Sequence, residues 1–273
     1  MEIPDGWGAR FARMFAVIEQ WQARIEQEPL TPSAGSSLAA DDTTFPSLPA
    51  SSAAYNGLVA AIEHLDFFRA ALTATRTLYP VAYYTVLRSA LMGSAQAVWV
   101  LAPRQRSTRV ENALRIAVDS YNQERKLIND ITNLTAEQQV IADRNLATLS
   151  TRLSAAAAAA DALGVNGATV ANWTLNMTTV IKEAIALAFP ENTADSGRVR
   201  ESSGMLWRSQ SGHAHGTPYS RLSLIRDGDL VRRPDGTAYA RSTSPIEHIG
   251  LAAAAPTLLV SEAWRLYDLR CKA

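Results

Sequence analysis

The sequence predicts an all-α protein, a multi-helix bundle into which one small β-hairpin is inserted. Apolar residues recur at three- and four-residue spacing along most of the 273 residues, the pattern of helices with one buried face. Prolines mostly fall between these periodic segments, where they begin or end helices. The hydrophobic content of 47% is sufficient for a packed core. We therefore expect a bundle of about eight helices.

The first helix is expected within residues 1–28, an N-terminal amphipathic segment. Its apolar residues share one helical face: Phe11, Phe15, Ile18, Trp21 and Ile25. From Pro29 the chain is rich in Ser, Ala, Thr and Pro, so residues 29–52 are predicted to form a flexible linker. Residues 53–273 are predicted to form the helical bundle domain.

Two helices open this domain. The first covers residues 53–76, and the second covers residues 80–102 with a proline at its first position. The second helix is the more apolar, which predicts a place at the centre of the bundle. Arg88 is its one buried or half-buried charge, and we expect it to pair with Glu63 or Asp66.

Three further helices are expected in the middle of the chain. One spans residues 105–132. The next begins with a capping box at residues 135–138 and ends near Gly164. The third runs over residues 170–189 and is ended by Pro190.

The last third of the chain combines helices with the hairpin. A short helix is expected over residues 199–211, with Gly212 weakening or ending it. Two apolar runs with Asp-Gly turn signals predict the β-hairpin near residues 221–241. The final helix is expected over residues 244–269, capped by its first residue and kinked or interrupted at Pro256.

The charge balance limits the classes of partner. Twenty-six basic and 26 acidic residues give a net charge of zero, which argues against a broad positive surface for nucleic acid. Between Arg198 and Arg241, however, there are eight arginines and only four acids. This local excess of positive charge is compatible with a small anion-binding site.

The expected location is the cytoplasm. Cys271 is the single cysteine, which excludes an intrachain disulfide and fits a reducing compartment. The N-terminal residues lack the pattern of a signal peptide, and the apolar runs are too short or too interrupted for a membrane span. We therefore expect no membrane partner.

Residues 207–216, Trp-Arg-Ser-Gln-Ser-Gly-His-Ala-His-Gly, form the strongest candidate for a site. Two of the four histidines lie here beside an arginine and two glycines. Imidazole transfers protons near neutral pH, guanidinium holds phosphate, and glycine lets the backbone approach a ligand. The candidate catalytic residues are Arg208, His213 and His215.

The spacings Arg-x4-His and Arg-x6-His resemble the signature of the HEPN ribonucleases. The polar Ser209 after the arginine and the all-α context agree with that family. A group of uncharacterised bacterial helical proteins, sometimes placed near HEPN domains, is similar at His64-Leu65, at residues 84–88, at residues 95–103 and at Ser-Gly-His-Ala-His-Gly. Those proteins often carry an acid after the arginine helix, where this chain has Met92-Gly93.

The resemblance implies cleavage of RNA, or RNA binding, in a stress or defence setting by a homodimer. His213 would be the general base and Arg208 would stabilise the attacked phosphate, without a metal or cofactor. His215 or its dimer mate would protonate the leaving oxygen, and an exchange of roles between the two histidines is the rival assignment. Ser209, Arg88 and Arg221 are the candidate substrate-binding residues.

Two other functions are open. The His-Gly segment can be a structural turn in a non-catalytic interaction protein with a protein partner or antitoxin. Alternatively, His213 and His215 can chelate a metal ion together with Glu63 and His64.

Overall fold

A computed structural model describes residues 6–28, 31–190, 194–222, 225, 230–240 and 244–273. Within these residues the fold is all-α with a two-stranded hairpin, which confirms the predicted class. The helices are α1 (Trp7–Ile25), α2 (Ser37–Asp42), α3 (Ala50–Thr75), α4 (Pro80–Leu101), α5 (Arg106–Asp130), α6 (Ala136–Ala162), the 3-10 helix η1 (Gly167–Asn172), α7 (Met177–Ala188), α8 (Ala194–Ala214), α9 (Pro218–Leu222) and α10 (Ile246–Cys271). The strands β1 (Leu230–Arg232) and β2 (Ala238–Ala240) pair antiparallel.

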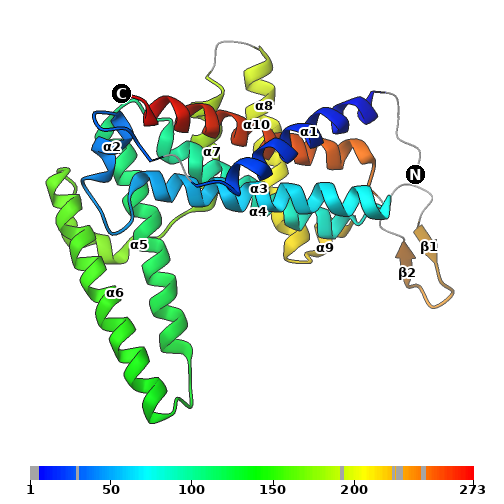
Figure 1. The fold of residues 1–273 in the computed structure, drawn as a ribbon. Coiled ribbons are helices and arrows are strands. Elements are labelled where there is room, and N and C mark those ends of the chain that lie inside the picture. Colours follow the sequence, from blue (N-terminus) through cyan, green and yellow to red (C-terminus); the bar gives the residue numbers. More distant parts are fainter. Residues whose placement is uncertain (1–5, 29–30, 191–193, 223–224, 226–229, 241–243) are drawn as a thin grey trace.

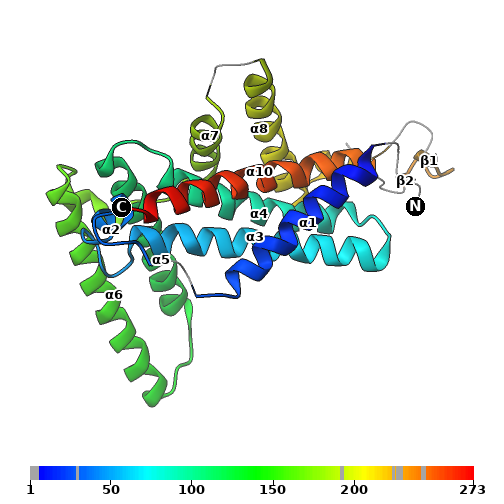
Figure 2. The same cartoon turned by 45° about the horizontal axis from the view of Figure 1, so that its top comes forward.

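The helices α1, α3, α4 and α10 form the body of the molecule, and α7 and α8 pack on one side of it (Figure 1). The α5 and α6 helices form an arm that extends away from this body, as both views show (Figures 1 and 2). The hairpin lies at the opposite end of the molecule from α6.

Helices α3 and α4 form the centre, where they cross closely at two glycines. A Cβ added to Gly57 would lie 2.7 Å from the carbonyl oxygen of Gly93, so no side chain fits there. Around this crossing, Leu58, Leu65 and Leu91 are fully buried. The prediction that residues 80–102 form a central helix agrees with this packing.

The arm has a hydrophobic cluster of its own. Leu149 and Leu153 of α6 pack against Leu114 and Val118 of α5, and Val170 of η1 closes the cluster. Tyr121 of α5 and Phe45, which lies between α2 and α3, belong to the same cluster. A second and larger cluster forms the main core of the body. The molecule thus has two apolar clusters that share helix α5.

Short sequence motifs predicted the first residues of α4 and α6 correctly. Helix α4 begins with Pro80, as expected. Helix α6 begins at a complete capping box, because Thr135 and Gln138 bond to each other's backbone N–H groups.

The segment predicted as a linker is in part helical. Within residues 29–52 the chain forms α2, and Leu38 and Asp41 of this helix are buried. Asp41 accepts two hydrogen bonds from Arg109 of α5, at 2.6 and 2.9 Å. No local sequence pattern predicts this buried ion pair, because the partners are 68 residues apart.

Three predicted boundaries were wrong. Residues 170–189 form η1 and α7 with an extended connection between them, not one helix. Gly212 does not end α8, which continues to Ala214. The hydroxyl of Ser244 does not cap α10, since it bonds to Tyr84 at 2.9 Å. Of the two effects predicted for Pro256, a kink or an interruption, the interruption is excluded, because α10 continues through this residue.

No helix in the described residues is both long and apolar enough to cross a membrane.

Candidate functional site

The site forms where the C-terminal half of α8 packs on the N-terminal half of α4. Two aromatic contacts hold the helices together. The ring of Tyr84 stacks on His213, with 4.6 Å between centroids, and the guanidinium of Arg88 lies 4.5 Å from the ring centre of Trp207. Trp207 in turn donates a hydrogen bond from Nε1 to Thr178 of α7 at 3.0 Å. These contacts fix the rotation of α8 about its axis.

Arg88 is a half-buried cation without a carboxylate among the described residues. Its Nε donates to Oγ of Ser211 at 3.1 Å. Burial lowers the pKa of Arg88, because the charged form loses solvation. The prediction of a partner at Glu63 or Asp66 was wrong, since Asp66 pairs with Arg69 at 2.7 Å. No carboxylate of the described residues therefore neutralises Arg88, which favours an anion as its ligand.

Ser211 lies on the same face of α8 as Arg208 and His215. The spacing of three and seven residues returns to one face of an α-helix. The helical hydrogen bonding continues past the last residue of α8, because the N–H of His215 donates to the carbonyl of Ser211 at 3.0 Å. Arg208 and His215 are both exposed. This face thus presents a guanidinium, a hydroxyl and an imidazole to solvent, with Arg88 behind the hydroxyl.

His213 lies on another side of α8 and is buried, with 2% of its surface exposed. Five residues separate it from Arg208, which corresponds to a rotation of about 140° around the helix. Its Nδ1 has no hydrogen-bond partner among the described residues, and burial lowers its pKa. The structure therefore separates the predicted pair Arg208 and His213. The rival assignment, with His215 beside Arg208, agrees with the helix geometry.

Helix α9 packs over Gly212, directly beside this face. A Cβ at Gly212 would overlap the hydroxyl of Tyr219, so a larger residue there would displace this ring. The same hydroxyl donates to the backbone carbonyl of Arg208 at 3.2 Å. Tyr219 is largely exposed, which leaves an aromatic ring open to solvent next to Arg208. Tyr219 was not among the predicted site residues, because its position beside Arg208 depends on α9, a helix too short to show a periodic pattern.

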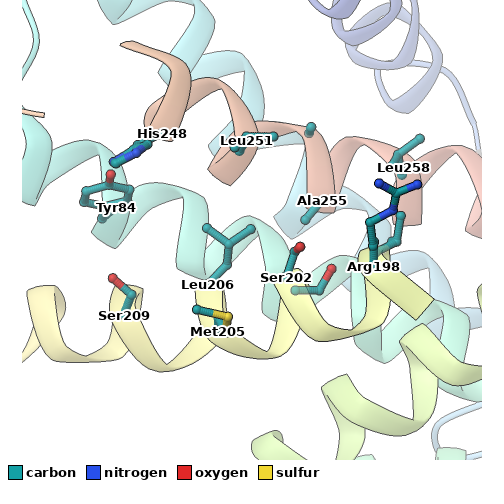
Figure 3. A pocket seen from close by; sticks show the side chains of 13 residues that line it. Tyr84, Arg198, Ser202, Met205, Leu206, Ser209, His248, Leu251, Ala255 and Leu258 are labelled. Carbon is teal, nitrogen blue, oxygen red and sulfur yellow. The ribbon is translucent and has the colours of Figure 1, made fainter. Parts of the chain in front are cut away.

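Ser209 and Arg221 are the other two predicted substrate-binding residues. Ser209 points into a groove between α8 and α10, not toward the face of Arg208 (Figure 3). The backbone of Arg221 lies in α9, but its side chain is outside the described part of the chain. Of the two side chains that the structure describes, Arg88 lies at the candidate site and Ser209 does not.

The groove beside Ser209 is a separate feature, with a volume of about 470 Å³. Tyr84 lies at one end, next to His248, and Arg198 lies at the other end. Between them the walls are apolar, with Met205 and Leu206 on α8 facing α10 (Figure 3).

The described residues contain no group of three or more His, Cys, Asp or Glu side chains placed to hold a metal ion. His213 is buried and His215 is exposed, so the two do not converge as chelating ligands. His64 uses Nδ1 in a contact of 2.6 Å with the carbonyl of Ala60 in its own helix. The geometry gives no support to the metal-binding alternative.

Comparison of the chain with protein-family models, with curated proteins and with solved structures found no match.

Proposed function

We propose that this protein binds RNA at the exposed face of α8 and cleaves it without a metal ion. The observation that carries the proposal is the convergence of Arg208, Ser211 and His215 on one solvent-exposed helical face, with Arg88 bonded to Ser211 from behind. Two guanidinium groups without a carboxylate partner in the described residues favour phosphate as the ligand. Arg-x6-His also fits the spacing of the HEPN signature.

The chemistry follows from the side chains. A neutral His215 accepts the proton of an RNA 2′-hydroxyl, whose oxygen then attacks the adjacent phosphorus. Arg208 and Arg88 stabilise the negative charge that grows on the phosphate oxygens. The bond to the 5′-oxygen breaks, and that oxygen takes a proton from water or from a second histidine. The products carry a 2′,3′-cyclic phosphate and a 5′-hydroxyl.

The exposed ring of Tyr219 supplies a stacking surface for a base next to Arg208. Stacking depends little on base identity, so we expect broad rather than sequence-specific RNA cleavage. We further propose that the active form is a cytoplasmic homodimer in a stress or defence setting, with the α8 faces of two copies lining one RNA channel.

The test is cleavage of 5′-end-labelled RNA by the purified protein in EDTA. Arg208→Ala and His215→Ala are each expected to lower the cleavage rate by at least about 100-fold, the usual contribution of a general base or a charge-stabilising group. Arg144→Ala on α6 and His248→Ala on α10 are matched controls, since both residues are exposed and lie outside this face. They are expected to cleave like the wild type.

Three results would contradict the proposal. Full activity of folded His215→Ala would remove the proposed base. Absence of cleavage by the wild type, combined with RNA binding that Arg208→Ala weakens, would reduce the function to binding. Absence of both would favour a non-catalytic interaction protein.

A further inference from the structure

The arm contains a second candidate binding site, separate from the exposed face of α8. A cavity of about 500 Å³ lies where α5, α6 and η1 meet, and its size is in the range of small-molecule pockets. Helix α5 contributes Arg125 and Asn129, α6 contributes Ser150 and Ser154, and Gly167 of η1 also lines the cavity. One cation and three neutral polar side chains therefore stand on its walls.

Hydrogen bonds hold the three elements around the cavity in place. The amide of Asn122 on α5 donates to the carbonyls of Ala171 and Trp173, at 3.3 and 3.4 Å. The N–H of Gly167 donates to the carboxylate of Asp161 on α6 at 2.8 Å. These bonds join α5 and α6 to η1, so the cavity is formed before a ligand binds, which lowers the cost of binding.

Arg125 is a half-buried cation at this cavity. Its guanidinium makes no hydrogen bond or ion pair with the described residues. Two acids lie on the same side of α6, but each accepts a hydrogen bond at 2.8 Å, Asp143 from Gln139 and Asp161 from Gly167. No Asp or Glu is among the described lining residues. An anionic ligand would provide the partner that Arg125 lacks within this part of the chain.

The neutral polar side chains favour a ligand with hydroxyl groups. The hydroxyl of Ser150 and the amide of Asn129 have no hydrogen-bond partner among the described residues. The hydroxyl of Ser154 donates to the carbonyl of Ser150 at 3.0 Å, and its oxygen remains an acceptor. No aromatic side chain is among the described lining residues, so the cavity offers no stacking surface for a flat ring.

We propose that this cavity binds a small hydroxylated monocarboxylate, with its carboxylate on Arg125 and its hydroxyl groups on Ser150, Ser154 and Asn129. A guanidinium binds a carboxylate through two parallel hydrogen bonds. A phosphate monoester carries nearly two negative charges at neutral pH, whereas the described lining residues include one cation. The charge balance therefore favours the carboxylate.

The ligand would contact α5, α6 and η1 together. Binding is therefore expected to slow hydrogen exchange of the α6 amides, because it stabilises the packed arm. The cavity shares no residue with the face of Arg208 and His215. This binding site is therefore independent of the proposed RNA chemistry, and Arg125→Gln is expected to leave RNA cleavage unchanged.

The test is an amide NMR titration of the full chain with D-glucuronate, D-glucose and D-glucosamine, which share a pyranose ring and differ in charge. Glucuronate is expected to shift the amides of Ser150 and Gly167 saturably and to bind at least tenfold more tightly than glucosamine. Arg125→Gln is expected to weaken glucuronate binding about tenfold and to leave glucose binding unchanged, because one charged contact is lost. Lys126→Gln is the matched control, since Lys126 is exposed and is not a lining residue.

A second variant blocks the cavity without removing its charge. Ser150→Phe places a ring in the cavity and is expected to abolish binding of both glucuronate and glucose. Thr151→Phe is the matched control, because Thr151 is the next exposed residue of α6 and does not line the cavity. Circular dichroism establishes that each variant retains its helices.

Three outcomes would overturn the proposal. One is the absence of saturable shifts when glucuronate is added to the wild type. Another is undiminished glucuronate binding by folded Arg125→Gln or folded Ser150→Phe, which would place the ligand elsewhere. The third is tighter binding of glucose 6-phosphate than of glucuronate, which would make the preferred ligand a phosphate ester.

Discussion

Arg88 and His213 illustrate how burial decides the role of a polar side chain. Arg88 is half-buried with one nitrogen bonded to Ser211, and no described carboxylate neutralises it. His213 is almost fully buried, and the ring of Tyr84 covers one face of its imidazole. A cation that keeps access to solvent can bind an anion, whereas a buried neutral imidazole mainly packs. We therefore assign the chemistry to the face of Arg88 and Arg208, and a packing role to His213.

The lowered pKa of His213 predicts a pH dependence of stability. Because its pKa is lower in the folded state than in the unfolded chain, the unfolded chain binds more protons as the pH falls. The contribution of His213 is fully present above the unfolded value of about 6.5 and is lost as the pH falls through the folded pKa. His213→Phe keeps the ring stacking and removes the titration.

Urea unfolding from pH 7.5 to pH 5 measures this effect. The free energy of unfolding of the wild type is expected to fall relative to that of His213→Phe as the pH decreases. Parallel curves for the two proteins would show that His213 does not titrate differently in the folded state.

Helix α8 is the element on which the proposed RNA chemistry depends, and its buried side is unusually polar. Ser203, Gln210 and His213 are all buried there, and the Gln210 amide has no hydrogen-bond partner among the described residues. A buried amide without a partner opposes folding. The packing of α8 therefore rests mainly on Trp207 and on the contacts with Tyr84 and Arg88.

Gln210→Met is expected to stabilise the protein. Methionine has a similar shape and removes both unpartnered polar atoms, so the free energy of unfolding should rise by about 1–3 kcal/mol. Hydrogen exchange of the α8 amides should slow at the same time. Glu201→Met, at an exposed position of the same helix, is the control and should change neither quantity appreciably. A loss of stability in Gln210→Met would indicate that the amide makes a favourable interaction.

At the scale of the whole molecule, the two apolar clusters predict two levels of stability. The arm cluster is small and consists of side chains from α5, α6 and η1 together with Phe45, whereas the main core includes α1, α3, α4, α7 and α10. The arm extends from the body, so its loss would leave the main core packed (Figure 1).

Leu149→Ala therefore should destabilise the arm selectively. The side chain is 1% exposed, and its removal is expected to cost the arm about 2–5 kcal/mol. Hydrogen exchange should accelerate in α6 and leave α3 and α4 protected. Leu91→Ala in the main core should instead accelerate exchange throughout the body. Equal acceleration everywhere in Leu149→Ala would mean that the molecule unfolds as one unit.

Local sequence signals sufficed for most helices. Apolar spacing identified the long helices, Pro80 marked the start of α4, and Thr135 with Gln138 marked the start of α6. These signals act over a few residues, so the sequence contains them directly. Helices α2 and α9 escaped prediction, since six and five residues are too few for a periodic pattern.

The sequence by itself determined the all-α class, the inserted hairpin and the segment around Arg208 as the place to look. Only the tertiary structure decided which histidine is exposed on the same face as Arg208. The contacts of α8 with Tyr84 and Arg88 determine which side of this helix is buried. The tertiary structure also decided that Arg88 does not pair with Glu63 or Asp66, and that Arg109 forms a buried ion pair with Asp41. The physical reason is range: helix formation is governed by neighbours within a few residues, whereas burial and charge pairing depend on residues that are distant in sequence.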